Sequence, residues 1–577
     1  MKREQPDDIG NPQMGWGSDA IAEMLRRLDI PFISLVPGAS YRGLHDSIVN
    51  YLGNEQPAMI VTLHEEHAVA IAQGYAKVTE KPMAVALHSN VGLLHATMAV
   101  FNAWCDRAPM LLLGATGPVD ADRRRPWIDW LHTSQDQGAL VRDFTKWDDQ
   151  PASVPAALES ILRANSLART GPRGPVYICL DVDLQEKALD SAVTFPDVAR
   201  FQPPRAAAPA KDAVLEAAAM LSAAERPMIL AGRVSRGDEA WRERVALAER
   251  MESPVLTDLK LAAAFPTKHP LHVAPPTFAV DGDAASMLAE ADVILSLDWL
   301  DLAGTLKLAG VSIDKTRIIH CSFDAYAHKA PGADHQGLPP VDISIPCHPD
   351  VLVSDLMDAL DRIGGTPRQQ VWWKPGQDAA DVRVGLHGAI TQFDMAEALD
   401  RVRGDRELCF TQVSLGWPAA TCDFRSPLDF LGRDGGAGVG SGPGIAVGVA
   451  LALADSDRIP VAIVGDGDFA MGANAIWTAV HYQLPLVVLI ANNRSYMNDE
   501  RHQQRVAETR NRPVDNKWIG QRMEDPIIDH AGMARAQGAE GLGPITEHDD
   551  LEVAIDRALD VAERGGVAVV DIHVIQD

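Results

Sequence analysis

The sequence lacks the features that mark secreted, membrane-spanning and nucleic-acid-binding proteins. Its 577 residues include six cysteines and no CxxC pair, which favours reduced, buried thiols in a cytosolic protein. No apolar run reaches the roughly 18 residues of a membrane span, and the N-terminal MKREQPDDIG has no signal-peptide core. The formal net charge of −27 leaves no basic excess to attract phosphate. We therefore expect a cytoplasmic globular protein that binds neither nucleic acid nor membrane.

Two common binding motifs are missing as well. The glycine-rich stretch from Asp434 to Ala452 fits GxGxxG in no register, so the sequence gives little support to a dinucleotide fingerprint there. The segment HEEH places His64 and His67 three residues apart, whereas the HExxH zinc motif needs histidines four apart. This spacing argues against a zinc protease site.

Short apolar runs alternate with helical patterns along the whole chain, which is too long for one hydrophobic core. A linker rich in proline and alanine and a second poorly patterned stretch divide the chain into segments 1–195, 206–365 and 385–577. Strands that alternate with amphipathic helices form parallel sheets covered on both faces. The sequence therefore predicts three α/β domains, each a doubly wound parallel sheet.

Polar side chains follow two apolar runs of the third segment. Gly465, Asp466 and Gly467 come directly after the first run, and Asn493 follows the second, 27 residues beyond Asp466. Parallel strands present their carboxyl ends at one sheet edge, where open α/β sheets bind ligands. Glycines leave backbone amides unobstructed, and a helix N-terminus favours phosphate. A carboxylate and a carboxamide are hard oxygen ligands, so the pattern predicts a Mg²⁺ site that anchors a diphosphate.

The GDG…NN pattern closely resembles the signature of the thiamin diphosphate (ThDP) enzymes, in the 2-oxo acid decarboxylase and acetolactate synthase family. The resemblance covers nearly the whole chain and implies ThDP and Mg²⁺ as cofactors. It implies that Asp466, Asn493 and the carbonyl of Ser495 hold the metal, with Gly465, Gly467 and Asp468 around the diphosphate. It also implies a pyrimidine-binding, a central and a diphosphate-binding domain, in that order.

The same family uses a glutamate of the first domain to drive the cofactor's aminopyrimidine to its imino form. The stretch LHEEHAVAIAQGYA matches the family's helix start and identifies Glu65 as that residue, with Glu66 as the alternative, an ordinary first-turn acid. In the glycine-rich segment the resemblance places Gly438 beside the pyrimidine amine and Val439 under the bent cofactor. Ser414 in TQVS falls where the family contacts the diphosphate.

Within the family, the pattern is most similar to the benzoylformate decarboxylases. The resemblance implies substrate-pocket roles for Ser40 in VPGAS and His88 in ALHSN, although Ser40 falls one residue later than the usual spacing. The central segment LSLDWLDLAG has no histidine where that branch carries a second catalytic one. His132 and Asp499 are the candidates for the missing proton-transfer role. Some relatives bind FAD or ADP in the central domain, but no glycine-rich phosphate loop is present here, so we do not expect FAD.

These observations predict non-oxidative decarboxylation of a small-molecule 2-oxo acid to an aldehyde. The alternatives are a carboligase or lyase of the acetolactate synthase, benzaldehyde lyase or 2-hydroxyacyl-CoA lyase type, and a ThDP-binding protein without catalysis. The resemblance also implies a homodimer or homotetramer, in which Glu65 of one subunit meets the ThDP held by Asp466 and Asn493 of its partner. The substrate itself depends on loop geometry, which the pattern does not give.

Overall fold

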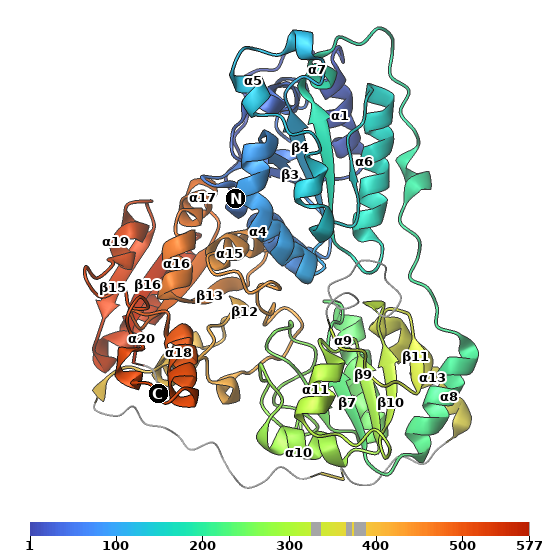
Figure 1. Ribbon diagram of the computed structural model, residues 1–577, viewed down its shortest axis with the longest axis vertical. Coiled ribbons are helices and arrows are strands. Elements are labelled where there is room, and N and C mark those ends of the chain that lie inside the picture. The colour runs from blue at the N-terminus through green and yellow to red at the C-terminus, as the bar shows by residue number, and fades with distance from the viewer. Residues whose placement is uncertain (325–335, 365–371, 374–387, 576–577) are drawn as a thin grey trace.

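Three parallel sheets follow one another along the chain, each covered by helices on both faces (Figure 1). The structure is a computed structural model that describes residues 1–324, 336–364, 372–373 and 388–575. We refer to the units as the first, central and third domains. This arrangement confirms the prediction of three parallel α/β domains. In the described residues, no helix is long and apolar enough to cross a membrane.

The first domain has a six-stranded sheet in the order β2-β1-β3-β4-β6-β5. Strands β3 and β4 are buried throughout, because helices cover both faces of the sheet. The strands are β1 (Phe32–Leu35), β2 (Ala58–Val61), β3 (Ala84–Leu87), β4 (Met110–Thr116), β5 (Asp148–Asp149) and β6 (Pro175–Asp181). The helices are α1 (Gly17–Arg27), α2 (Arg42–Asp46), α3 (Glu65–Thr79), α4 (Ser89–Cys105), α5 (Ile128–Leu131), α6 (Val154–Arg169) and α7 (Val182–Glu186).

The central domain has a five-stranded sheet in the order β11-β10-β9-β7-β8. Its strands are β7 (Pro227–Ala231), β8 (Val255–Leu256), β9 (Val293–Leu297), β10 (Arg317–Cys321) and β11 (Ile343–Ile345). Its helices are α8 (Lys211–Ala223), α9 (Asp238–Met251), α10 (Gly282–Glu290), α11 (Leu302–Leu308) and α13 (Pro349–Ile363).

The third domain has a five-stranded sheet in the order β12-β13-β14-β16-β15. Strands β13 and β14 are neighbours, with Gly465 opposite Ala491, so the residues that follow them emerge at the same edge. The strands are β12 (Leu408–Gln412), β13 (Ile459–Gly465), β14 (Leu486–Asn492), β15 (Glu540–Ile545) and β16 (Val567–His573). The helices are α14 (Gln392–Arg403), α15 (Gly442–Ala452), α16 (Asp466–Gly472), α17 (Ala475–Tyr482), α18 (Met497–Thr509), α19 (His530–Arg535) and α20 (His548–Glu563).

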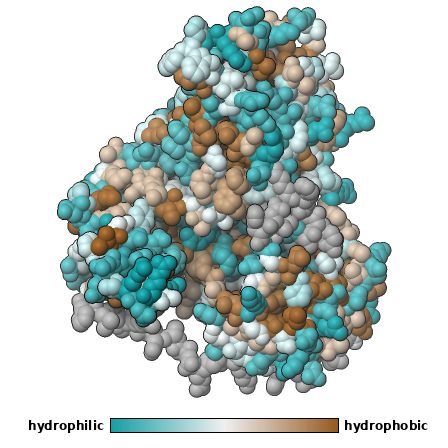
Figure 2. Space-filling view, in the orientation of Figure 1, coloured by the Kyte–Doolittle hydropathy of each residue, from teal (hydrophilic) through white to brown (hydrophobic). Residues whose placement is uncertain are grey.

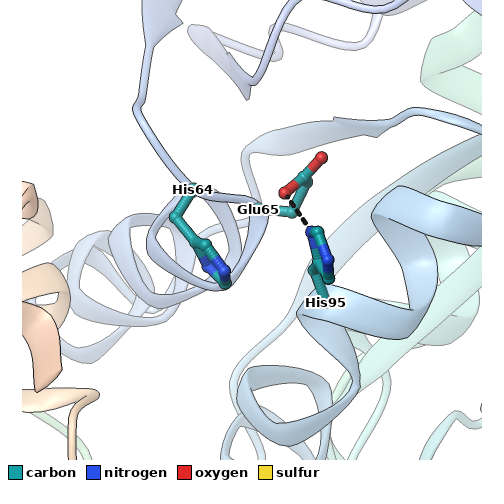
Figure 3. A group of neighbouring side chains, drawn as sticks. All are labelled: His64, Glu65 and His95. Atoms are coloured by element: carbon teal, nitrogen blue, oxygen red, sulfur yellow. Dashed lines mark hydrogen bonds and ion pairs between the residues drawn. The ribbon is translucent and has the colours of Figure 1, made fainter.

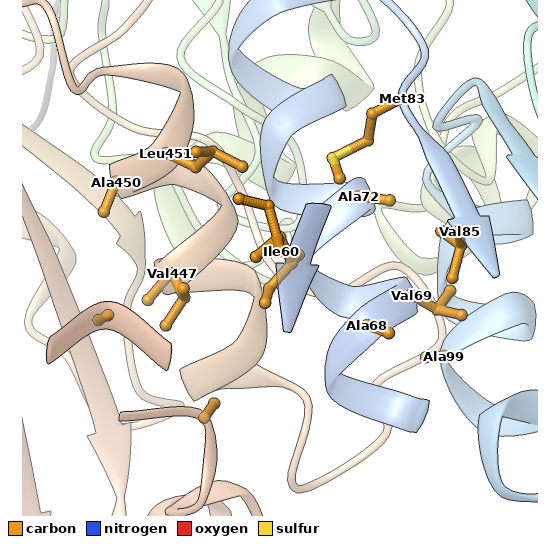
Figure 4. Packing of buried hydrophobic residues seen from close by; sticks show 14 of the residues in the cluster. Ile60, Ala68, Val69, Ala72, Met83, Val85, Ala99, Val447, Ala450 and Leu451 are labelled. Atoms are coloured by element: carbon orange, nitrogen blue, oxygen red, sulfur yellow. The ribbon is translucent and has the colours of Figure 1, made fainter. Parts of the chain in front are cut away.

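The first and third domains share one hydrophobic core, in which helices α3 and α15 lie directly against each other (Figure 4). The two backbones approach closely because glycines face the contact. A methyl group on Gly74 of α3 would overlap the carbonyl oxygen of Ile445, and one on Gly448 of α15 would overlap that of Ile71. The start of each helix is therefore fixed relative to the other.

Buried charges join the first domain to the central one. Arg107, which follows α4, donates to Asp298 at 2.6 Å and also pairs with Asp324. Burial raises the pKa of Asp298, but Arg107 and Arg233 outweigh it and hold that pKa below its usual value. The same contact borders a cavity of about 330 Å³ at the carboxyl edge of the central sheet. Removing one partner of such a buried network leaves a charge uncompensated.

The α3–α15 contact predicts an unusual response to Gly74→Ala and Gly448→Ala. In an ordinary helix interior, alanine is favoured over glycine by about 1 kcal/mol. Here the added methyl must displace backbone, so we expect a loss of about 1–3 kcal/mol or more instead. Calorimetry should show a lower melting temperature for both variants. Ala219→Gly on the exposed face of α8 serves as the control for helix propensity alone. An unchanged or higher melting temperature for Gly74→Ala would contradict the contact.

Candidate active site

Glu65 lies at the carboxyl edge of the first sheet, as the first residue of α3. The helix begins there because the backbone N–H of Glu66 donates to His64 Nδ1 at 3.2 Å, which makes His64 the N-cap. Burial of Glu65 against the first turn of α4 is allowed by Gly92, where a side chain would contact the carboxyl group. The site therefore has a buried acid at a helix N-terminus.

His95 of α4 faces Glu65, with His95 Nδ1 3.0 Å from Glu65 Oε2 (Figure 3). The imidazole of His64 stacks on that of His95, with ring centroids 5.1 Å apart and planes at 18°. Sequence reasoning missed His95, because its contact with Glu65 joins two different helices, α3 and α4, and no pattern within either helix indicates it.

Glu66, the alternative to Glu65, faces the third domain. Its carboxyl group accepts a hydrogen bond from Ser441 Oγ at 3.4 Å, in the glycine-rich segment of the third domain. Burial raises the pKa of Glu66. Asn102 of α4 donates to the same hydroxyl at 2.6 Å. Within one chain, the first domain therefore reaches the glycine-rich segment through Glu66 and Asn102, whereas the Glu65 carboxyl points away from the third-domain ribbon (Figure 3).

Ser40, His88 and His132 come together beside Glu65, from three separate segments. Ser40 Oγ lies 2.8 Å from His88 Nδ1, and the His88 and His132 rings meet edge to face at 4.9 Å. Burial lowers the pKa of His88, and His132 lowers it further. Because a neutral imidazole both accepts and donates protons, this group suits proton transfer near Glu65.

Asp466, Asn493 and Ser495 meet at the carboxyl edge of β13 and β14. Asp466 Oδ1 accepts from the N–H of Gly467 at 3.0 Å, and the amides of Arg494 and Ser495 also face the carboxyl group. Asn493 Oδ1 accepts from the N–H of Ser495 at 2.9 Å. Asp466 Oδ2 is buried without a hydrogen-bond partner. A buried, unpartnered carboxylate oxygen near a carboxamide fits a divalent cation, so the residues present suit Mg²⁺.

Asp468 lies next to this group, on the first turn of α16. Its carboxyl group accepts from the N–H of Gly440 at 2.6 Å and from Gln412 Nε2 at 2.8 Å. Burial raises its pKa. Gly467 packs under the ring of Tyr496, where a side chain would clash. Glycine amides and a helix N-terminus therefore surround the Asp466 edge, which is suited to an anionic group.

The remaining predicted residues lie around this edge. Ser414 follows β12 and donates to Gln392. Gly438 lies under Met98 of α4, and Val439 is 51% exposed in the segment before α15. Asp499 is exposed on the first turn of α18, where its N–H donates to the carbonyl of Tyr496 at 2.9 Å, and it does not belong to the Glu65 group. The structure thus forms two half-sites, one around Glu65 and one around Asp466.

Exposed apolar side chains gather around both half-sites, and brown side chains are visible where the first and third domains meet (Figure 2). Near the Glu65 half-site the exposed residues are Leu63, Leu94, Met98, Trp127, Trp130 and Leu131. Near the Asp466 half-site they are Leu415, Val439 and Met471. Apolar surface of this kind marks interaction sites.

Known proteins resemble this chain over its whole length. Profiles described as thiamine pyrophosphate enzyme N-terminal TPP binding, central and C-terminal TPP binding domains match residues 15–140, 214–330 and 412–572. A benzoylformate decarboxylase of Pseudomonas aeruginosa is 26% identical over 521 residues, which cover 87% of this chain and 89% of that protein. An acetolactate synthase isozyme 1 large subunit of Escherichia coli is 25% identical, with coverage of 83% and 82%.

A solved structure of a thiamine diphosphate-dependent 4-hydroxybenzoylformate decarboxylase from Rhodococcus jostii superposes with a TM-score of 0.77. It is 20% identical and covers 97% of this chain and 99% of its own. At that identity the likeness is one of fold.

Asp434, at the start of the glycine-rich segment, predicts a pH effect on stability. Burial raises its pKa to about 7, and the nearby Asp468 raises it as well. For an acid whose pKa is raised by folding, the unfolded state ionises first, so stability falls as pH rises from about 4 to about 7. Asp434→Asn removes this penalty. We expect a higher melting temperature than wild type at pH 8 and a smaller difference at pH 5. Equal gains at both values would show that the Asp434 carboxyl ionises normally.

Proposed function

Because the chain belongs to the thiamine pyrophosphate enzyme family, we propose that it is a ThDP- and Mg²⁺-dependent decarboxylase of a 2-oxo acid, which releases an aldehyde without oxidation. The family membership confirms the resemblance expected from the GDG…NN pattern. The observation that carries the proposal is the unpartnered Oδ2 of Asp466, buried beside Asn493 and Ser495. A decarboxylase is favoured over a synthase by the Ser40–His88 pair, which matches the pocket expected for benzoylformate decarboxylases.

In this proposal the third domain holds the cofactor. Asp466, Asn493 and the carbonyl of Ser495 bind Mg²⁺, and the glycines of the same edge leave amides free for the diphosphate. Ser414, Gly438 and Val439 flank the rest of the molecule. When bound, ThDP supplies a nucleophilic carbon for the substrate carbonyl and an electron sink for the departing CO2.

The first domain supplies the proton transfers. Glu65 would exchange a proton with the cofactor's pyrimidine through the carboxyl oxygen that does not face His95. Ser40 and His88 orient the 2-oxo acid, and His88 or His132 delivers the proton that completes the aldehyde. The lowered pKa of His88 keeps its imidazole neutral near pH 7. A neutral ring forms no ion pair with the substrate carboxylate.

The Glu65 carboxyl group points away from the third domain of its own chain, and this orientation supports a shared active site (Figure 3). We propose that Glu65 of one subunit meets the Asp466 edge of a second copy, in a homodimer or a pair of dimers. The exposed apolar side chains around both half-sites support this assembly. Sedimentation should find no monomer with activity, and a fully active monomer would remove the shared site from the proposal.

A carboligase of the acetolactate synthase type is the second candidate. It is supported by relatives of that name and by the central segment Asp298–Asp301, which has no histidine at the expected second proton donor. Product analysis separates the candidates, since free aldehyde supports decarboxylation and a condensed hydroxy ketone supports the carboligase.

The Glu65 assignment predicts the outcome of the first functional assay. Incubation with ThDP, Mg²⁺ and a panel of aliphatic and aromatic 2-oxo acids should release CO2 and aldehyde, identified by mass spectrometry. Glu65→Gln keeps the side-chain volume but cannot transfer a proton, so we expect turnover to fall by about 10²–10⁴-fold. Glu66→Gln is the matched control and should retain turnover much closer to wild type. If Glu66→Gln is inactive and Glu65→Gln active, the two roles are reversed.

The Asp466 assignment predicts a binding defect. Asp466→Asn replaces a charged metal ligand by a neutral one, so ThDP titrated with Mg²⁺ in a calorimeter should bind at least about tenfold more weakly. Asp455→Asn, on an exposed turn of the same domain, should bind normally. Wild-type affinity in Asp466→Asn would refute the metal site.

A further inference from the structure

His95 is a polar contact of Glu65 to which the family pattern gave no role. The distance from His95 Nδ1 to Glu65 Oε2 is 3.0 Å. The Glu65 side chain is only 11% exposed, whereas that of His95 is 59% exposed. The carboxyl group of this pair is therefore buried, and the imidazole is largely exposed to solvent.

The orientation of the His95 ring is fixed by its neighbour. His64 Nδ1 accepts the N–H of Glu66, so this nitrogen carries no proton and the ring is held by the helix cap. The His95 ring stacks on it at 5.1 Å, with the planes nearly parallel. This arrangement presents Nδ1 of His95 to Glu65 rather than to solvent.

A metal site does not explain the arrangement as well. Donor atoms of His64, Glu65 and His95 lie within 4.8 Å of one another. However, metal binding by His64 would need its cap hydrogen bond to break, because the proton on its other nitrogen would have to move to Nδ1. The stacked rings also direct their nitrogens in parallel planes rather than toward one point.

The two oxygens of the Glu65 carboxyl group have separate surroundings. Oε2 faces His95, and Oε1 lies near Gly92, where an added methyl group would be 3.4 Å away. The other titratable groups near the carboxyl come from neighbouring segments. They are His64, Glu66 and His67 at the start of α3, His88 before α4, Tyr41, and His132 beside His88. Unlike these groups, His95 lies within hydrogen-bond distance of the carboxyl group and is also largely exposed to solvent.

We propose that His95 is a positioning residue that holds Glu65 and exchanges the carboxyl proton with solvent. This inference rests on the proposed function, in which Glu65 exchanges a proton with the cofactor's pyrimidine. The pair holds one transferable proton, either on the Glu65 carboxyl group or on His95. Once Oε1 has given its proton to the cofactor's pyrimidine nitrogen, the neutral His95 would take a proton from water at Nε2 and pass its Nδ1 proton to Oε2, which protonates the carboxyl group again. No proton is created or lost, and no oxidant or metal is needed.

The first test measures protons taken up when ThDP and Mg²⁺ bind, by calorimetry in buffers of different ionisation enthalpy from pH 5.5 to 8. In wild type, the proton shared by Glu65 and His95 supplies part of the protons that cofactor binding requires. His95→Gln preserves a hydrogen-bond donor but has no group that titrates between pH 5.5 and 8. We expect this variant to take up more protons than wild type below neutral pH, by up to about one. Identical uptake in the two proteins would overturn the proposal.

The second test follows hydrogen–deuterium exchange at the cofactor's thiazolium C2, by proton NMR after acid quench and without substrate. We expect His95→Gln and His95→Ala to slow exchange by about tenfold or more, and added imidazole to restore the rate of His95→Ala. If His95→Gln exchanges at the wild-type rate, His95 acts only as a hydrogen-bond donor, and this result would contradict its role in proton exchange.

The control is His481→Gln. His481 Nε2 lies 2.9 Å from Glu4 Oε1, so it forms a similar imidazole–carboxylate pair away from the half-sites, and its loss should change neither measurement. The two proposals fail differently. If wild type does not bind ThDP, the proposed function fails. If wild type exchanges in a Glu65-dependent manner and His95→Gln matches it, only the role of His95 fails.

Discussion

The close approach of helices α3 and α15 is the constraint on which both half-sites depend. Gly74 and Gly448 let the two backbones touch, and the residues around them form one core across the first and third domains. Glu65 begins α3, and the glycine-rich segment ends where α15 begins. A shift of either helix would therefore move the acid and the proposed cofactor cradle at the same time. Side chains between the helices could change rotamer and absorb a small shift. Where the backbones touch, a shift of one helix moves the other.

The start of α3 separates two adjacent acids. Successive residues of a helix lie about 100° apart, so Glu65 and Glu66 must face different surroundings. Glu65 turns toward His95, and Glu66 turns toward Ser441 of the same chain. If Glu65 serves a cofactor held by a second copy, one helix N-terminus would border two active sites of a dimer. The arrangement links them through adjacent residues of one rigid element rather than through a flexible loop.

Local sequence features predicted the three parallel sheets and the edge at which Asp466 lies. The apolar runs of β13 and β14, with Gly465–Gly467 and Asn493 after them, predicted a shared sheet edge, and the structure places Asp466 against Arg494 and Ser495. His95 required a comparison across two helices. Gly74 contacts Ile445, and Arg107 contacts Asp298, 191 positions further along the chain. Both contacts join residues that are far apart in the sequence. Periodicity within a segment contains no information about such pairs, because it describes the face of an element and not its partner.

In the proposed function, the buried acids of the third domain make a divalent cation necessary for cofactor binding. Burial raises the pKa of Asp466 to about 6 and that of Asp434 to about 7, and it also raises the pKa of Asp468. These carboxyl groups lie around the edge proposed to receive a diphosphate. The Asp468 carboxyl already accepts the N–H of Gly440, one of the amides nearest that edge. A diphosphate added without a cation would place further negative charge beside buried acids at low local dielectric. In the proposed function, a Mg²⁺ ion bound to Asp466 Oδ2 would offset that repulsion and would be the partner that this oxygen lacks.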